Sequence, residues 1–464
     1  MNSIKRITTG LAVLLAGTAE LALAQGAPIS LQDAITVAVN SNPQVAQAQY
    51  NKEAIQFERK QAQGLYAPRV DLEGSAGVRR LDNATRRALN TNDDALYPLE
   101  AQARADWTVI DFGRRRGELL RQAARVDGAS LRVIERSEFI ALQVTRQYLD
   151  VMLQQRVVAA TMDNVAFHRT LAGDLGTGVQ QGSISVADKQ QAEERLQAAV
   201  VRQAEAEQDL TEAKIKLQRL TGLEINDVQM PPTLAASLPG SLDEAVGLAR
   251  TQNPLVREAV ADVDAANAHA ASVKGDGYPR LGVELTGRIG EDIDGFRGRT
   301  TDLQARGYMR WTVFDGGISR ANYQEMVRRA SEQRYRLYDI VREAEEDVRT
   351  AWSTMRTQNR LVTEITAQSK VSDDLLLSYR SQFNVGRRSL LDVLDAQNTR
   401  YNAQVRLETA RFSEVFAQYQ TLAATNRLLT ALSVTPGAGA GEAERERFKY
   451  GPSVPAELQY RTMP

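Results

Sequence analysis

An internal repeat constrains this chain more than any other feature of its sequence. A segment that begins with Ser30-Leu31 reaches Asn42-Pro43, and its counterpart, 211 positions later, begins with Ser241-Leu242 and reaches Asn253-Pro254. Further on, residues 182–188 recur as residues 386–392, at an offset of 204. Two stretches of constant register with a seven-residue difference between them indicate a duplicated chain. We therefore expect two repeats, at 25–240 and 241–434.

Each repeat contains a pair of segments in which apolar and polar residues alternate. These segments lie near residues 69–78, 101–109, 281–289 and 303–313. A period of two over about ten residues predicts a strand with one polar and one apolar face. Such strands suit a transmembrane barrel with a wet lumen. Ordinary amphipathic hairpins on a soluble core are the alternative.

Two observations support the barrel. Trp107 and Trp311 hold matching positions near the same ends of their strands, where aromatic residues face a membrane interface. Four strands cannot close a barrel, and an open sheet in lipid leaves unpaired backbone groups at both edges. The barrel therefore requires at least two chains to share their strands.

The rest of each repeat has helical periodicity. Residues 113–181 contain no proline, and apolar residues such as Leu119, Val126 and Val144 recur at helical spacing. Nearly seventy residues would make a helix of about 100 Å. The sequence of the second repeat predicts an equally long helix over 318–383. Shorter helices are predicted at 31–65, 184–220, 242–273 and 390–429. The predicted fold is mainly α with β: a long antiparallel helical tunnel, an α-barrel, joined to four strands of a shared β-barrel. A soluble coiled-coil rod is the alternative.

Both ends of the chain differ from the repeats. Lys5 and Arg6 precede the apolar run Leu11–Leu15, and Ala22-Leu23-Ala24 follows. This order predicts a secretory signal over residues 1–24, because the apolar stretch is shorter than a transmembrane helix needs. Residues 435–464 begin with Thr435-Pro436-Gly437 and continue with mixed charge, which predicts a disordered tail.

Composition excludes several classes of function. The chain has no Cys and only 2 His, so thiolate metal sites, disulfides and cysteine nucleophiles are excluded. A formal net charge of −1 shows none of the basic bias that nucleic-acid binding needs. No phosphate-binding loop, metal cluster or catalytic triad is recognisable at a known spacing. We therefore expect neither enzymatic activity nor a cofactor or bound metal.

Several motifs together resemble the TolC family of outer-membrane efflux and secretion channels. They are Leu31-x-x-Ala34 with Asn42-Pro43 and its repeat, Phe314-Asp315-Gly316-Gly317, and the run from Val385 to Ala396. The resemblance extends from Ser30 to Val434. It implies a homotrimer in outer-membrane lipid, with twelve strands and twelve helical columns. It also implies a periplasmic adaptor and an inner-membrane pump, either an ABC exporter or a proton-driven efflux protein. The competing hypothesis is a periplasmic coiled-coil adaptor or structural interaction protein.

The resemblance implies that two helical turns close the tunnel. Gly182 and Gly386 suit these gate turns, and Ser185 and Ser389 suit the caps of the helices that follow. Three copies each of Asp392 and Asp395 would form two acidic rings able to favour cations. For Asp392 a purely structural alternative exists, because an acid in the first turn of a helix complements the helix dipole.

The same resemblance predicts a closed-state link between the turns. Arg388 and Asp188 match the positions that form it, and we predict an ion pair worth at most about 1 kcal/mol per protomer. Two residues depart from the family pattern, since Phe383 replaces a hydroxyl-bearing aromatic and Ala187 replaces a threonine. The link is therefore expected to contain fewer polar contacts than in related channels. Cargo choice would rest with the pump.

Overall fold

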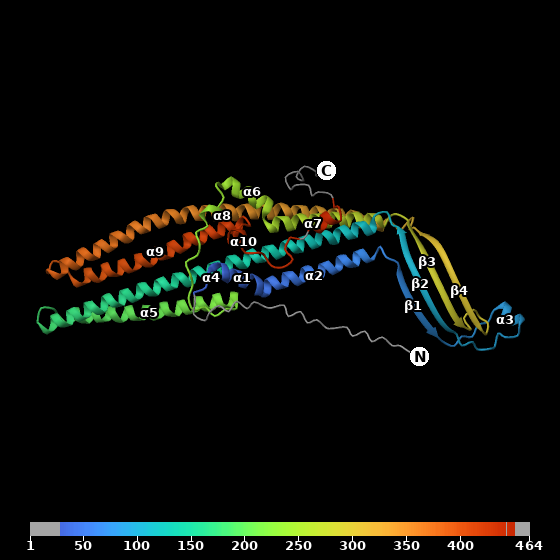
Figure 1. The fold of residues 1–464 in the computed structure, drawn as a ribbon, viewed down its shortest axis with the longest axis horizontal. Helices are drawn as coiled ribbons and strands as arrows, with labels where there is room; N and C mark the ends of the chain where they lie inside the picture. The colour runs from blue at the N-terminus through green and yellow to red at the C-terminus, as the bar shows by residue number, and fades with distance from the viewer. Residues whose placement is uncertain (1–27, 442, 451–464) are drawn as a thin grey trace, which may run out of the picture.

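The computed structural model describes residues 28–441 and 443–450. The predicted signal, residues 1–24, lies outside this part of the chain. The molecule is elongated, with long helices along its length and a β-sheet at one end (Figure 1). Among the described residues, no helix combines the length and the apolar character that crossing a membrane requires.

The two repeats form matching sets of helices. Helices α4 and α8 have 67 residues each, which corresponds to about 100 Å at 1.5 Å per residue, as the sequence predicts. The first repeat contributes α1 Leu31–Ser41, α2 Pro43–Gly64, α4 Arg114–Gln180 and α5 Val186–Thr221. The second contributes α6 Leu242–Gln252, α7 Pro254–Gly275, α8 Ile318–Asn384 and α9 Leu390–Ala424. Shorter pieces are α3 Ala84–Ala88, the 3-10 turn Ala235–Ser237, α10 Leu428–Ala431 and α11 Glu444–Arg447.

Two predicted helices are broken where the sequence reads Asn-Pro. We expected single helices over 31–65 and 242–273, but α1 ends before Asn42 and α6 ends before Asn253. The residue before a proline is driven out of the helical region, and Asn42 has φ −70° and ψ 130°. Its side chain then caps the next helix by accepting a hydrogen bond from the Gln44 amide at 2.9 Å. Likewise, the helix predicted over 390–429 ends at Ala424, and α10 is separate.

Small residues allow the long helices to pack closely. The buried alanines of α5 recur every seven residues, and the helix packs along α4. A seven-residue repeat of small side chains favours a left-handed coiled pair with a short distance between axes. Helices α8 and α9 form the equivalent pair of the second repeat (Figure 1). The α5 stripe consists of Ala192, Ala199, Ala206 and Ala213.

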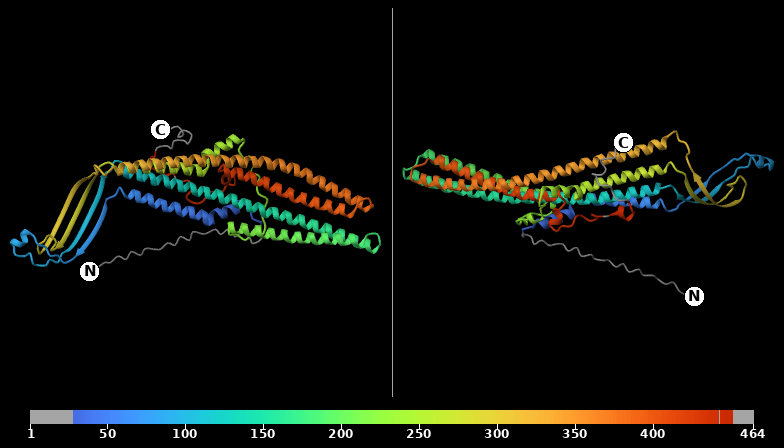
Figure 2. Two further views of the ribbon diagram at one scale, coloured as in Figure 1. Left: turned by 180° about the vertical axis from the view of Figure 1, so that it is seen from behind. Right: turned by 90° about the horizontal axis from the view of Figure 1, so that it is seen from above.

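A collar of short elements covers the middle of the helical layer. It consists of α1, α10 and residues 223–238, whose apolar side chains pack on one face of α4 through Ile140, Val144 and Tyr148. The Tyr148 hydroxyl donates to the Gln229 carbonyl at 2.6 Å and so fixes the collar to the helix. The collar lies on one side of the helix layer (Figure 2).

The four predicted strands form one antiparallel sheet in the order β1-β2-β3-β4. The apolar side chains of one face are exposed in the protomer, and Leu72 and Leu303 are 83% and 84% exposed. On the polar face, Glu284 is only 4% exposed and forms ion pairs with Arg104 and Arg306. The strand order leaves β1 and β4 as the edges of the protomer's sheet. The strands are β1 Arg69–Ala76, β2 Leu99–Ile110, β3 Arg280–Glu291 and β4 Arg299–Arg310.

The tryptophans occupy equivalent junctions between helix and sheet. The Trp107 indole N–H donates to the Tyr66 carbonyl at 2.9 Å, and the Trp311 N–H donates to the Gly277 carbonyl at 3.3 Å. Both acceptors follow the helix that precedes their hairpin, so the duplication extends to single hydrogen bonds. Trp311 lies one residue beyond the end of β4, whereas Trp107 lies inside β2.

The predicted disordered tail needs a correction for its described part. Helix α11 packs against α4, and Arg445 forms ion pairs with Asp127 at 2.7 Å and with Asp264 at 2.6 Å. The Tyr450 hydroxyl donates to the Asp264 carbonyl at 2.8 Å. The mixed charge of the tail predicts disorder. In the described part, Arg445 instead pairs with buried carboxylates that lie far away in the sequence.

Candidate functional site

The two predicted gate turns lie at the end of the molecule opposite the sheet (Figure 1). Gly182 follows α4 with φ 73°, and Gly386 follows α8 with φ 75°. This left-handed conformation ends helices and favours glycine, because a Cβ is disfavoured there. The Gly386 amide donates to the Phe383 carbonyl at 2.9 Å and closes the last turn of α8.

Serine caps start the helices that return from the tip. The Ser185 hydroxyl oxygen accepts from the Asp188 amide at 3.1 Å, and Ser389 accepts from the Asp392 amide at 3.3 Å. The Asp392 carboxylate in turn accepts from the Ser389 amide at 3.2 Å, which completes a capping box. Hydrogen bonds from the Ser389 side chain and amide hold the pKa of Asp392 below its usual range.

Asp392 therefore caps a helix, while Asp395 has an exposed side chain one turn further along α9. The capping role does not remove the charge of Asp392, because its lowered pKa keeps the carboxylate ionised. Asp392 therefore presents negative charge at the tip.

Arg388 has a different carboxylate partner from the one predicted. Its guanidinium lies 3.8 Å from the Asp392 carboxylate, and its Nε donates to Gln382 Oε1 at 3.1 Å. Asp188 instead accepts from the hydroxyl of its own cap, Ser185, at 2.7 Å. In the described chain, Arg388 thus forms its ion pair with Asp392. The ion pair between Arg388 and Asp188 stays a prediction for the assembled channel.

Tyr379 is a tip residue that sequence reasoning missed. The Arg388 guanidinium lies 4.3 Å from the centre of the Tyr379 ring, within reach of a cation–π interaction. Phe383, where the family pattern has a hydroxyl-bearing aromatic, packs against the apolar cluster of Leu390 and Leu394. The tip thus keeps a hydroxyl-bearing aromatic beside the arginine, one helical turn before the expected position. The i, i+4 spacing of Tyr379 and Phe383 is the signal that could have indicated it.

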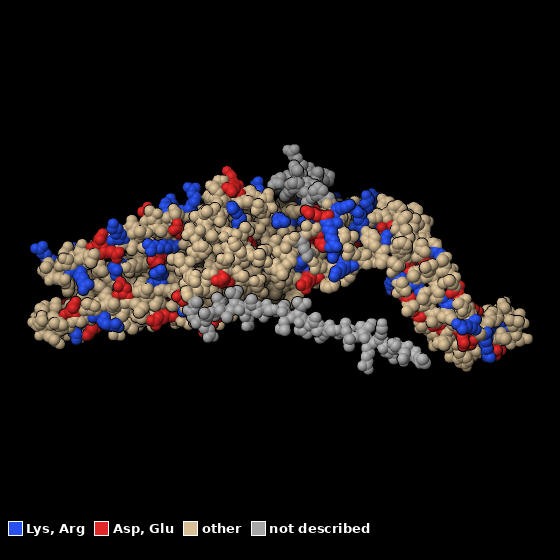
Figure 3. Space-filling view, viewed as in Figure 1, with Lys and Arg blue, Asp and Glu red and all other residues tan. Residues whose placement is uncertain are grey.

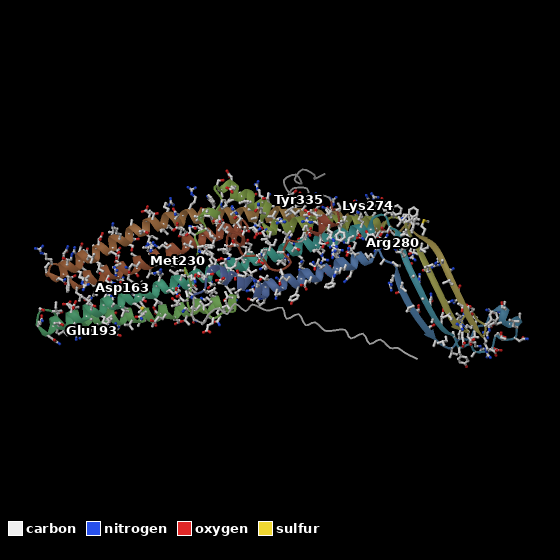
Figure 4. The ribbon with its side chains drawn as sticks, viewed as in Figure 1. Asp163, Glu193, Met230, Lys274, Arg280 and Tyr335 are labelled. Atoms are coloured by element: carbon white, nitrogen blue, oxygen red, sulfur yellow. The ribbon has the colours of Figure 1, made fainter. Side chains whose placement is uncertain are left out.

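A second set of polar contacts joins the two hairpins further from the tip. Arg400 of α9 forms ion pairs with Asp163 of α4 at 3.0 Å and with Asp373 of α8 at 2.7 Å. Beside it, the buried Gln397 amide donates to Asn164 Oδ1 at 2.8 Å. Asp163 lies on the half of α4 that leads to the tip (Figure 4). No sequence motif indicated this link, since its members come from three separate helices.

Charge elsewhere on the visible face is mixed. Acidic and basic side chains are interspersed along the helices and over the sheet (Figure 3). Within residues 28–441 and 443–450, no group of three or more His, Cys, Asp or Glu side chains could hold a metal ion. The tip acids of one protomer are therefore not grouped as a metal site.

Comparison with known proteins agrees with this architecture. The model of the outer membrane efflux protein family matches residues 34–223 and 245–434, one match for each repeat. Among solved structures, the Campylobacter jejuni CmeC outer membrane channel is similar with a TM-score of 0.76 and 13% sequence identity. That likeness covers 90% of this chain and 88% of the other.

Curated proteins are also similar to this chain, among them one from Vibrio cholerae and one from Brucella suis. Outer membrane protein TolC of Vibrio cholerae is 20% identical over 413 residues, covering 84% of this chain and 89% of that protein. Outer membrane efflux protein BepC of Brucella suis is 23% identical over 292 residues, covering 62% of this chain and 63% of that protein, which is just under two thirds of its length. The paired family matches account for both halves of the duplicated chain. The chain belongs to the outer membrane efflux protein family, whose members are outer-membrane channels with a helical tunnel in the periplasm.

Proposed function

We propose that three copies of this chain assemble into a passive export conduit. The observation that carries this proposal is the sheet: β1 and β4 are unpaired edges, and one face exposes Leu72 and Leu303. A lipid-facing sheet must pair its edges, and three sheets of four strands would close a twelve-stranded barrel. The 67-residue helices would continue that barrel as a tunnel of about 100 Å.

The tip would serve as the gate of this conduit. Three copies of Asp392 and Asp395 at its rim would form acidic rings that favour cations. Arg388 lies beside Asp392 in the protomer and is exposed, so it could pair with Asp188 when the hairpins of the trimer converge. Such exposed contacts are weak, and a docked partner could break them.

The partners we propose are a periplasmic adaptor and an inner-membrane pump, either an ABC exporter or a proton-driven protein. Family membership supports a tripartite system, and the cargo, protein or small molecule, would be chosen by the pump. A soluble adaptor is disfavoured, because its sheet would expose Leu72 and Leu303 to water.

Substitutions on the two faces of β4 test the membrane assignment. Leu303→Arg places a charge on the apolar face, where burial in lipid costs about 2–4 kcal/mol near mid-depth. Gln304→Arg is the matched control on the polar face. We expect Leu303→Arg to reduce the amount of trimer in outer-membrane fractions while Gln304→Arg leaves it unchanged. A soluble monomer for the unmodified chain, or equal amounts for both variants, would contradict the proposal.

A further inference from the structure

A cavity lies within the protomer where α9 ends and α7 begins. It has a volume of about 280 Å³ and lies between α4 and α8. Its walls come from α4, α7, α8 and α9, from Asn253 before α7 and from the turn after α9. The walls include Glu138, Phe139, Leu255, Asp347, Ala424 and Asn426.

Two buried oxygen atoms in this wall have no hydrogen-bond partner. Glu138 is 7% exposed, and its Oε1 accepts from the Leu429 amide at 3.3 Å, but its Oε2 has no partner. Asn426 Oδ1, in the turn after α9, is also unpaired. Buried polar atoms are nearly always satisfied, because leaving one unpaired costs about 1–3 kcal/mol. Two such oxygen atoms on one cavity leave positions where a ligand could donate hydrogen bonds.

The rest of the lining defines the donor's chemistry. Glu135 and Asp347 add two more carboxyl groups, and the described lining contains no Lys or Arg. The remaining walls are largely apolar, contributed by residues such as Phe139, Leu142 and Leu255. We propose that this cavity binds a primary ammonium group carried on a compact apolar body. The ammonium would donate to Glu138 and Asn426, and the apolar body would pack against Phe139.

The cavity lies beside the collar. Its Glu138 accepts a hydrogen bond from the Leu429 amide of α10 at 3.3 Å, and Leu142 packs against the apolar cluster of the collar.

The burial of Glu138 makes ammonium binding depend on pH. Desolvation raises the pKa of Glu138 to about 8, although the hydrogen bond from the Leu429 amide acts to lower this pKa. Desolvation also raises the pKa of Glu135 and of Asp347, which face the cavity from α4 and α8. The lining residues of α7 and α9 carry no charge. A bound ammonium stabilises the Glu138 carboxylate and displaces its proton, so binding should strengthen as pH rises towards 8.

Calorimetric titration of the intact oligomer with 2-phenylethylammonium chloride tests the site. A primary ammonium, like that of lysine with a pKa of about 10.4, stays mostly charged at pH 6.5 and 8.5. We expect tighter binding at pH 8.5, and roughly tenfold weaker binding of the neutral analogue 2-phenylethanol. Equal affinity for the amine and the alcohol would overturn the proposal.

Variants then locate the site. Glu138→Gln should weaken ammonium binding roughly tenfold and remove its pH dependence, since a charge-assisted hydrogen bond is lost. Asp347→Asn should weaken binding less, and it decides the question should Glu138→Gln fail to assemble. Glu364→Gln, on α8 like Asp347 but exposed and outside the lining, is the matched control and should bind like the unmodified protein. Unchanged affinity in both lining variants would refute the site. These experiments measure ligand binding and not transport. A negative result is therefore distinguishable from a loss of channel activity.

Discussion

Gly386 shows how one backbone angle shapes the tip. Its φ of 75° lies where an L side chain is strained, although a Cβ would meet no atom within 4 Å. We therefore expect Gly386→Ala to lower the free energy of unfolding by about 1–2 kcal/mol per protomer. Thermal unfolding of the purified oligomer measures this. Gly173→Ala, at an exposed and uncrowded position inside α4, is the control and should be neutral or stabilising by up to about 1 kcal/mol. Equal effects of both changes would contradict the strain argument.

Glu138 gives the protein a predictable response to pH. Its pKa is about 8 in the folded chain, against an ordinary value of 4.5. Between these values the folded state binds a proton that the unfolded state has lost. The resulting stability is present below pH 4.5 and is lost as pH rises to about 8. Glu138→Gln should therefore flatten the fall in melting temperature between pH 5 and pH 8. Parallel curves for the two proteins would show that Glu138 does not titrate in this range.

At the scale of elements, Arg400 joins three helices. Its ion pairs with Asp163 and Asp373 connect the α4–α5 hairpin to the α8–α9 hairpin. We expect Arg400→Met to destabilise the contact between hairpins by about 1 kcal/mol and to increase the open fraction of the channel. Arg411→Met is the control, because the ion pair of Arg411 in the described part of the chain lies within α9, with Glu408 at 2.8 Å. Antibiotic leakage into cells that carry each variant is the measurement. A similar leakage with both variants would contradict a latch at Arg400.

The elements differ in how far the sequence predicts them. The strands and the two 67-residue helices follow from periodicity, because a repeating pattern records which face is buried. The breaks before Pro43 and Pro254 were missed, although Asn-Pro is a local signal for a helix end. Gly182 and Gly386 were predicted from turn chemistry and adopt the expected conformation.

Contacts between distant segments were out of reach of the sequence. The partners of Arg400 and the burial of Glu138 depend on how helices far apart in the chain pack side by side. The pairing of Arg388 with Asp392 shows the same limit, because the spacing of residues does not fix which acid a flexible guanidinium contacts. The spacing of the residues identified the turn at the tip but not the carboxylate that pairs with Arg388.

At the scale of the whole molecule, the described tail joins the two repeats. Arg445 connects Asp127 of α4 to Asp264 of α7, and both carboxylates are buried. Arg445→Met would remove this cation from beside two buried carboxylates, and removing one partner of a buried pair costs about 3–5 kcal/mol. We expect a marked fall in the melting temperature of the oligomer. Arg447→Met is the matched control, because Arg447 is exposed and its ion pair within the described residues is with Glu444, three residues away. Equal melting temperatures for the two variants would show that the tail does not hold the repeats together.

The duplication explains the shape of the protomer. Two helix-hairpin-helix units place their strands in one sheet and their turns at the opposite end (Figure 1). Each half supplies two strands and one tip turn, so the sheet and the proposed gate are separated by the length of α4.

Single-channel conductance in planar lipid bilayers tests the account most directly. The purified unmodified protein should insert and show a small conductance, because we propose that the tip is closed. The double variant Asp188→Asn with Arg388→Gln should show a conductance several times larger, since links of at most about 1 kcal/mol per protomer hold the closed state. Arg387→Gln is the neighbouring control and should match the unmodified protein. Channels of equal conductance in all three proteins would contradict the gate, and the absence of any channel would contradict the conduit itself.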